Sequence, residues 1–202
     1  MSFLALADWA VAGRALPGEP DSGDLHVVVP LPDGALVAVI DALGHGPEAA
    51  AAARIAAETL QAYAHEPVSA LVHRCHQRLR PTRGAVMSVV SFSAPFATLT
   101  WLGIGNVEGY LVPAETGVRR RESILTRGGV IGFQLPGLKP TTVPVAPGDT
   151  LVLATDGIGN AFIEAPVRHG SAQAAADCVL REYGKATDDA LVLVARFAGG
   201  AP

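Results

Sequence analysis

Apolar residues along the chain fall into short runs that predict strands. The clearest run covers residues 35–40, ends at Asp41 and is followed by a glycine-rich turn at 44–46. A second run, 150–154, leads in the same way to Asp156 and further glycines. A buried strand that delivers an acid to a loop, next to a helix start, is a common way to build a metal or phosphate site.

Three stretches have the pattern of helices. Residues 47–64 are rich in alanine and begin with a proline, which suits a first helical turn. Residues 67–79 repeat apolar side chains at the helical spacing, and we expect their polar members to lie on a solvated face: His73, Arg74 and His76. Residues 171–183 predict a helix that stops at Gly184, after a helical turn at 161–162.

The remaining apolar runs predict strands separated by turn residues. They cover 3–15, 25–29, 85–93, 96–105, 108–114, 123–125, 140–145 and 190–197. We expect the three runs between 85 and 114 to form an antiparallel meander. Residues 16–23 form a turn-rich loop, and the glycines between 128 and 132 predict a loop that can approach a ligand closely.

The first hairpin allows two registers. A turn at residues 32–33 places Asp24 opposite Asp41, whereas a turn at 33–34 places His26 opposite Asp41. In both registers the two carboxylates project from the same face, because side chains alternate with a period of two.

Composition predicts one compact domain over residues 1–202, with 198–202 as a tail. Half of the residues are hydrophobic and 17% are charged, which suits a well-buried fold. The net charge of −4 argues against a nucleic-acid-binding surface, and the short basic run 119–121 is interpreted as a solvated hairpin edge.

The two cysteines and the hydropathy pattern bear on location. Cys75 and Cys178 lie far apart without metal-ligand spacing, which is typical of reduced thiols. There is no signal-like N-terminus and no apolar run of the roughly 18 residues that span a bilayer. We expect a cytoplasmic protein that binds neither membranes nor nucleic acid and is a monomer.

Four carboxylates stand at strand ends, with Asp24 and Asp188 at starts and Asp41 and Asp156 at finishes. Antiparallel neighbours bring a start beside a finish, so the four can converge on one sheet edge. Each aspartate alone is better explained by turn formation, but four ionised carboxylates gathered together need a cation. Oxygen ligands suit Mg²⁺ or Mn²⁺, and two such ions would activate a water for attack on phosphorus.

These motifs together resemble the metal-dependent PP2C-type phosphatases, and in particular the bacterial branch typified by SpoIIE and RsbX. The resemblance rests on SGD at 22–24, DALGHG at 41–46, GIGNVEG at 103–109, TDGI at 155–158 and DDALVLVARF at 188–197. It implies an α+β fold, a four-layer αββα sandwich of two antiparallel sheets with helices outside. It also implies two Mn²⁺ or Mg²⁺ ions at one end of the sandwich.

The resemblance assigns roles to individual residues. The metal ligands would be Asp24, Asp41, the carbonyl of Ala42, Asp156 and Asp188, with Asp189 in a position where relatives carry Asn or Asp. Asp41 would bridge the ions and, with Asp156, hold the catalytic metal-bound water. His45 is a candidate acid, and substrate phosphate would contact Gly44 and Arg14. Relatives usually carry glycine where this chain has Ala42, and alanine disfavours a positive φ, which would weaken the second metal site.

By the same resemblance, the protein would be an RsbX-like phosphoserine/phosphothreonine protein phosphatase. Its substrates would be phosphorylated stressosome or anti-anti-sigma (STAS-domain) proteins of a partner-switching pathway. Two alternatives stay open: a catalytically weak or dead module that sequesters a regulatory partner, and a hydrolase of small phosphate esters.

Overall fold

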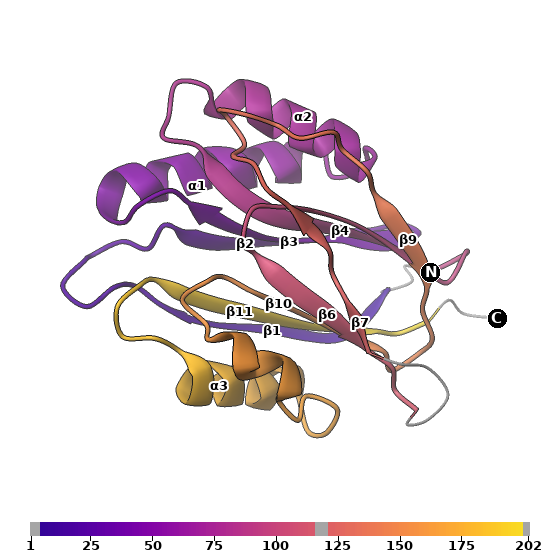
Figure 1. The fold of residues 1–202 in the computed structure, drawn as a ribbon. Helices are drawn as coiled ribbons and strands as arrows, with labels where there is room; N and C mark the ends of the chain where they lie inside the picture. Colours follow the sequence, from indigo (N-terminus) through magenta and orange to yellow (C-terminus); the bar gives the residue numbers. More distant parts are fainter. Residues whose placement is uncertain (1–4, 116–120, 200–202) are drawn as a thin grey trace.

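A computed structural model describes residues 5–115 and 121–199. It confirms the predicted αββα arrangement: two facing sheets lie in the middle and helices cover the outside of each (Figure 1). Among the described residues, no helix is long and apolar enough to cross a membrane.

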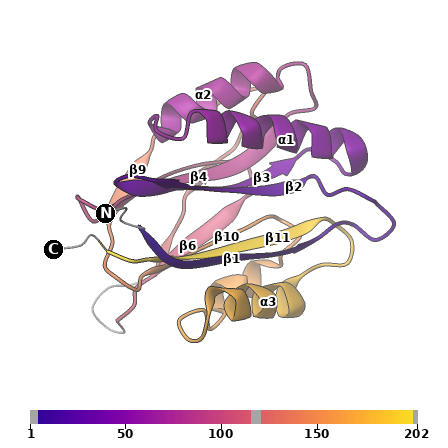
Figure 2. The ribbon, with the colours of Figure 1, turned by 180° about the vertical axis from the view of Figure 1, so that it is seen from behind.

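The first sheet contains the N-terminal strand and the C-terminal strand side by side. Its order is β1-β11-β10-β6-β7, with antiparallel pairing throughout. The strands are β1 (Leu6–Arg14), β11 (Ala190–Phe197), β10 (Thr150–Ala154), β6 (Glu108–Val112) and β7 (Glu122–Ser123). Helix α3 (Ala172–Tyr183) and the short 3₁₀ helix η1 (Asn160–Glu164) cover its outer face (Figure 2).

The second sheet has the order β2-β3-β4-β5-β8 and lies under helices α1 (Gly46–Ala62) and α2 (Val68–Leu79). Its strands are β2 (Asp24–Leu31), β3 (Gly34–Ala42), β4 (Ala85–Ser93), β5 (Thr98–Ile104) and β8 (Thr126–Arg127), with β9 (Thr141–Pro144) added beside β5. All of its pairs are antiparallel except the two-residue pairing of β5 with β8.

Strand β3 shows why the first apolar run is continuous. Leu36, Ala38 and Ile40 pack against the helices, whereas Val37 and Val39 pack between the two sheets. A central strand of a four-layer sandwich is buried on both faces, so every position must be apolar. The alanine-rich α1 completes this layer, because its small buried side chains let the helix lie close to the sheet.

The predicted meander is wrong in its last strand. β4 and β5 pair in the second sheet, but β6 belongs to the first sheet and pairs with β10. The chain crosses between the sheets at Gly105, which has a positive φ of 88° and lies so close to Val86 that a Cβ atom would collide with it. A Gly-Asn pair predicts a hairpin turn equally well, so local sequence cannot separate the two outcomes.

The ends and the basic run of the chain are only partly described. The predicted tail begins with an ordered contact, since the Ala198 N–H donates to the Ala5 carbonyl over 2.7 Å. Residues 200–202 lie outside the described residues, as do 119 and 120 of the basic run. Arg121, the last residue of that run, stacks over the ring of Tyr110 at 4.7 Å.

Candidate active site

The β2–β3 hairpin adopts the register in which Asp24 lies directly opposite Asp41. Its two-residue turn is at Pro32 and Asp33, because Leu31 pairs with Gly34. Asp24 is buried with 5% of its surface exposed, and its neighbour on β3 is partly buried. The hairpin therefore supplies two facing carboxylates at one end of the second sheet.

The first sheet supplies the other acids at the same end. Asp156 follows β10, and Asp188 precedes β11. Thr155 joins the two sheets, because its hydroxyl donates to Oδ2 of Asp24 over 2.7 Å and also accepts the Leu191 N–H at 3.0 Å. Acids from distant parts of the chain thus meet at one end of the sandwich, but they come from two facing sheets and not from the single sheet edge that strand pairing alone predicts.

An open pocket of about 590 Å³ lies at this end. It is bordered by Asp41, Asp156 and Asp188, together with Leu43, Gly44, His45, Asn106, Gly128 and Val130. Asp24 is not part of the pocket wall and lies buried behind Asp41. Within the described chain, no three His, Cys, Asp or Glu side chains form a ready-made metal-binding group.

Asp24 and the acids of the pocket wall are held in an environment that disfavours their negative charge. Burial and then repulsion from Asp41 raise the pKa of Asp24 to about 8. Burial, followed by repulsion from Asp156 and Asp188, raises the pKa of Asp41 to about 7. The carboxylate of Asp41 has no hydrogen-bond partner among the described residues.

Asp156 shares this environment but has compensating contacts. Burial and the charge of Asp188 raise its pKa, whereas Lys185 and a hydrogen bond from Asn106 oppose the shift. The Asn106 amide donates to Oδ2 of Asp156 over 2.7 Å, and the Lys185 ammonium donates to its carbonyl over 2.6 Å. An all-oxygen set of crowded, partly unpartnered carboxylates fits a hard divalent cation, which would stabilise the ionised forms.

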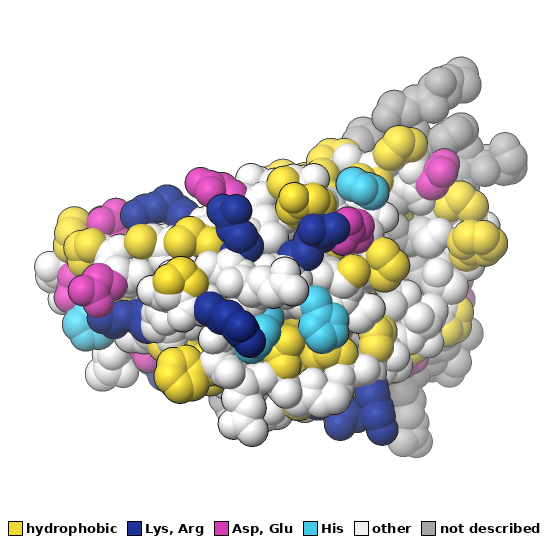
Figure 3. Space-filling view, turned by 90° about the horizontal axis from the view of Figure 1, so that it is seen from above, with side chains coloured by type: hydrophobic (Ala, Val, Ile, Leu, Met, Phe, Trp, Pro, Cys, Tyr) yellow, Lys and Arg dark blue, Asp and Glu magenta, His cyan; other side chains and the backbone are white. Residues whose placement is uncertain are grey.

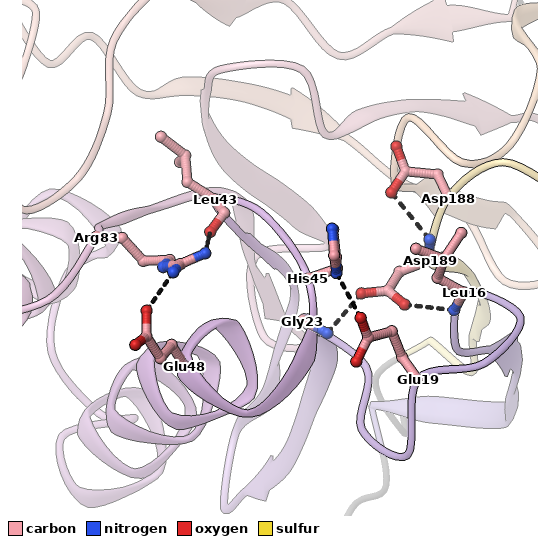
Figure 4. Close-up of polar contacts among 9 residues, drawn as sticks. All are labelled: Leu16, Glu19, Gly23, Leu43, His45, Glu48, Arg83, Asp188 and Asp189. Atoms are coloured by element: carbon pink, nitrogen blue, oxygen red, sulfur yellow. Dashed lines mark hydrogen bonds and ion pairs between the residues drawn. The ribbon is translucent and has the colours of Figure 1, made fainter.

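The two adjacent aspartates before β11 differ in what they contact. Asp189 is buried, and its two carboxylate oxygens accept the backbone N–H groups of Leu16 and Gly23, each over 2.7 Å (Figure 4). Asp188 borders the pocket and accepts the N–H of Asp189 over 2.9 Å. Asp189 thus anchors the β1–β2 loop, while Asp188 faces the open space.

Ala42 and Arg14 do not behave as the sequence suggested. Ala42 is the buried last residue of β3 and pairs with Ala85 in extended conformation, so the expected strain does not arise. Among the described residues, the only non-glycine with positive φ is Ala97. Arg14 lies outside the pocket wall, and its guanidinium donates to the Lys185 carbonyl over 2.6 Å.

The turn after β3 gives the pocket its rim. Gly44 has a φ of 82°, which explains the glycine, and a Cβ there would collide with the Arg83 guanidinium. His45 precedes α1, and its Nδ1 lies 2.8 Å from Oε1 of Glu19 (Figure 4). Arg83 donates to the Leu43 carbonyl over 3.4 Å and pairs with Glu48.

Several of these contacts have no signal in the sequence. Thr155, Asn106, Lys185, Glu19 and Arg83 stand in loops or strand ends without a spacing that links them to the aspartates. Thr155 and Asn106 lie inside the quoted motifs TDGI and GIGNVEG, which could have drawn attention to them, but the other three residues have no such signal. Their partners are up to 131 residues away.

The facing sheets, the outer helices and the acidic pocket at the sandwich end are those of a PP2C-type phosphatase. The family model for stage II sporulation protein E (SpoIIE) matches residues 32–198. The chain therefore belongs to the SpoIIE family.

Individual relatives agree with this assignment. The phosphoserine phosphatase RsbX of Bacillus subtilis (strain 168) is 24% identical over 161 residues, which cover 79% of this chain and 78% of RsbX. A chain from a bacterial stressosome study, on a modular system adapted to control secondary messenger signaling, superimposes with a TM-score of 0.85 at 27% identity. That match covers 94% of this chain and 98% of the other.

A crystal structure of RsbX in complex with magnesium shares the fold. It superimposes with a TM-score of 0.84 at 21% identity, and the match covers 94% of each chain.

Proposed function

We propose that this protein is a divalent-metal-dependent phosphatase that removes phosphate from serine or threonine of stressosome or STAS-domain proteins in a partner-switching pathway. The observation that carries the proposal is the pocket bordered by Asp41, Asp156 and Asp188, with Asp24 buried behind it. The likeness to the phosphoserine phosphatase RsbX supports the activity, and the likeness to the chain from the stressosome study supports the stressosome setting.

The metal ligands in this proposal are Asp24, Asp41, the Ala42 carbonyl, Asp156 and Asp188. Two Mn²⁺ or Mg²⁺ ions bound there would neutralise phosphoryl charge and lower the pKa of water for in-line attack on phosphorus. Asn106 and Lys185 hold Asp156 through its side chain and its carbonyl, which fixes the direction of one ligand. Ligand orientation by such neighbours is a general requirement of metal sites.

The leaving oxygen needs a proton when the phosphorus–oxygen bond breaks. His45 borders the pocket, and Glu19 holds its Nδ1 so that Nε2 is left to face a substrate. We assign His45 the donation of that proton to the serine or threonine oxygen, and Gly44 a backbone contact to the substrate. Arg14 is left out, because its guanidinium is engaged outside the pocket.

The test is Mn²⁺-stimulated dephosphorylation of a phosphorylated STAS-domain protein by Asp41→Ala and Asp156→Ala. Each change should lower the rate by about 10²-fold or more, as for other groups that stabilise transition-state charge. Asp33→Ala, in the exposed turn at the far end of the same hairpin, is the matched control and should keep full activity. Circular dichroism checks that each variant is folded.

Full activity of either pocket variant would contradict the mechanism. Partner binding without metal-stimulated turnover would favour the sequestering module, and rapid turnover of metabolite phosphates with indifference to phosphoproteins would favour a small-molecule hydrolase. The cytoplasmic location and the monomeric state stay predictions.

A further inference from the structure

Helix α2 and the loop after it form a strongly basic segment in an acidic protein. Residues 67–83 contain four arginines and two histidines and no aspartate or glutamate, whereas the whole chain has a net charge of −4. All of the excess negative charge therefore lies elsewhere in the chain.

The basic side chains point away from the core. The apolar side of α2 is buried against the second sheet, and its polar side is left on the surface. We call His73, Arg74, Arg78 and Arg80 the basic face. Figure 3 views the molecule from above the helices and shows several separate Lys/Arg and His side chains on this side, with Asp and Glu side chains next to some of them.

Most of the basic face has no acidic partner of its own. His73, Arg78 and Arg80 are exposed and form no hydrogen bond or ion pair with the described residues. Arg74 is the exception, because it donates to Glu66 over 2.7 Å and stacks on the Tyr63 ring at 3.9 Å. Unpaired cations that lie close together repel one another, so an added set of carboxylates would be bound favourably.

A groove runs along this face between α1 and α2. It encloses about 290 Å³ and is lined by Thr59, Tyr63, Arg74, Gln77 and Arg78, among others. It offers charge, hydrogen-bonding groups and one aromatic surface, a mixture typical of protein–protein contacts.

The basic segment reaches the rim of the active-site pocket. The Gly132 N–H donates to Nδ1 of His76 over 3.0 Å, and this glycine belongs to the loop whose Gly128 and Val130 border the pocket. At the end of the segment, Arg83 donates to the carbonyl of Leu43, another pocket residue. The C-terminal end of the basic face, at Arg80, is therefore its nearest part to the pocket, whereas Arg74 and the Tyr63 end of the groove lie about four helical turns of α1 farther away. An extended acidic segment that follows α2 from the groove towards Arg80 would lead to the pocket.

We infer that the basic face binds an acidic surface of the phosphoprotein substrate and so directs its phosphorylated residue to the pocket. The inference rests on the proposed phosphatase function. The protein's negative net charge repels anionic substrates at long range. A local basic face next to the pocket offsets that repulsion for a substrate that carries aspartates and glutamates around its phosphorylation site.

Nucleic acid and membranes fit this face less well. Nucleic-acid binding depends on neutralising many phosphates, whereas this short face offers three arginines, one of which is already paired with Glu66. An interfacial membrane helix needs a free apolar side, but the apolar side of α2 is buried in the core. An acidic protein surface is the occupant that the charges and the groove favour.

Binding is tested first without turnover. A fluorescein-labelled peptide with a block of six aspartates and glutamates, without phosphate, is titrated in the presence of EDTA and compared with a peptide in which serines replace the block. The acidic peptide should bind more tightly and lose affinity with added salt. Arg78→Glu and Arg80→Glu should each weaken its binding by about 5-fold, the scale of an exposed charge pair.

The matched control is Arg181→Glu, which makes the same charge change on α3 at the opposite side of the molecule. It should change the affinity by less than about 2-fold, because solvent and salt screen charges at that separation. An equal loss in Arg181→Glu would mean that only net charge matters and would overturn the inference. So would equal binding of the two peptides, or tighter binding of a single-stranded DNA 20-mer or phosphatidylserine vesicles through the same arginines.

Turnover separates this inference from the proposed function. With Mn²⁺, wild-type protein should have a higher kcat/KM for a phosphoserine peptide with the acidic block than for the serine version, and Arg78→Glu should bring that ratio towards one. Binding of the acidic peptide through α2 without hydrolysis of either phosphopeptide would support the binding surface and overturn the phosphatase. Hydrolysis of both with equal efficiency would overturn the basic face alone.

Discussion

Replacing Asp24 by asparagine should stabilise the metal-free protein at alkaline pH. Asp24 is buried opposite Asp41, and its pKa is raised to about 8. Asparagine keeps an oxygen that can accept the Thr155 hydroxyl but carries no charge to bury. The variant thereby isolates the electrostatic cost of the buried carboxylate.

The sign and size follow from proton linkage. Between about pH 4 and pH 8 the folded protein keeps the Asp24 proton and the unfolded chain loses it, so stability falls as pH rises. A difference of one bound proton over about 2.5 pH units lowers the free energy of unfolding by about 3 kcal/mol between about pH 5.5 and pH 8. For a domain of this size that is a change in Tm of about 6–12 °C.

The assay is thermal unfolding in EDTA at the two pH values, followed by circular dichroism. Wild type should be the less stable protein near pH 8, and Asp24→Asn should remove about 3 kcal/mol of the difference between the two pH values. The smaller contribution of Asp41, whose pKa is raised to about 7, should remain in the variant. Asp33→Asn, in the exposed turn of the same hairpin, should leave the difference unchanged.

Saturating Mn²⁺ should reverse the order. A bound cation stabilises the ionised carboxylate, and a ligand at about 1,000 times its Kd adds about 4 kcal/mol to stability. Wild type should then gain more than the variant. A metal-free wild type that is more stable near pH 8 than near pH 5.5, or a variant with an unchanged pH profile, would refute the reasoning.

Two further changes test how the site is supported. Asp189→Ala removes the acceptor of the Leu16 and Gly23 N–H groups and should lower the free energy of unfolding by about 2–4 kcal/mol, since two hydrogen bonds to a charged group are lost. Chemical denaturation measures this loss, and a value below about 1 kcal/mol would show that other contacts hold the loop. Gly157→Ala places a Cβ against the Asp189 carbonyl. This overpacking should cost about 1–3 kcal/mol and lower Tm by several degrees. Gly137→Ala, where nothing lies near the added Cβ, is its control and should be close to neutral.

Elements with a strong local pattern were predictable from the sequence. The strands at 85–93, 150–154 and 190–197 match β4, β10 and β11 residue for residue, because each is a mainly apolar stretch bounded by turn residues. The aspartates at strand ends were found for the same reason. The sequence could not decide between the two registers of the β2–β3 hairpin, because both turns keep the acids on one face. Only the folded strands select one of them.

What failed depends on contacts between distant segments. The turn after β5 leads to the other sheet because its neighbours in space, not its own residues, decide the pairing. Arg14 was a candidate for phosphate only by its place early in the chain, and its contact with the Lys185 carbonyl, 171 residues away, could not be foreseen. The sequence also could not assign different contacts to Asp188 and Asp189, which differ only in which way each carboxylate faces.

The Thr155 hydroxyl, which joins Asp24 on one sheet to Leu191 on the other, has a wider consequence. Each sheet carries two of the acids, so the thickness of the apolar layer between the sheets determines the width of the pocket. Phe92 and Phe197, whose rings stack at 5.8 Å in that layer, lie at the ends of β4 and β11 that are farthest from the pocket. Smaller side chains at these two positions would let one sheet tilt against the other. The spacing of the acids at the far end of the sandwich would then change, and with it the affinity for the cation.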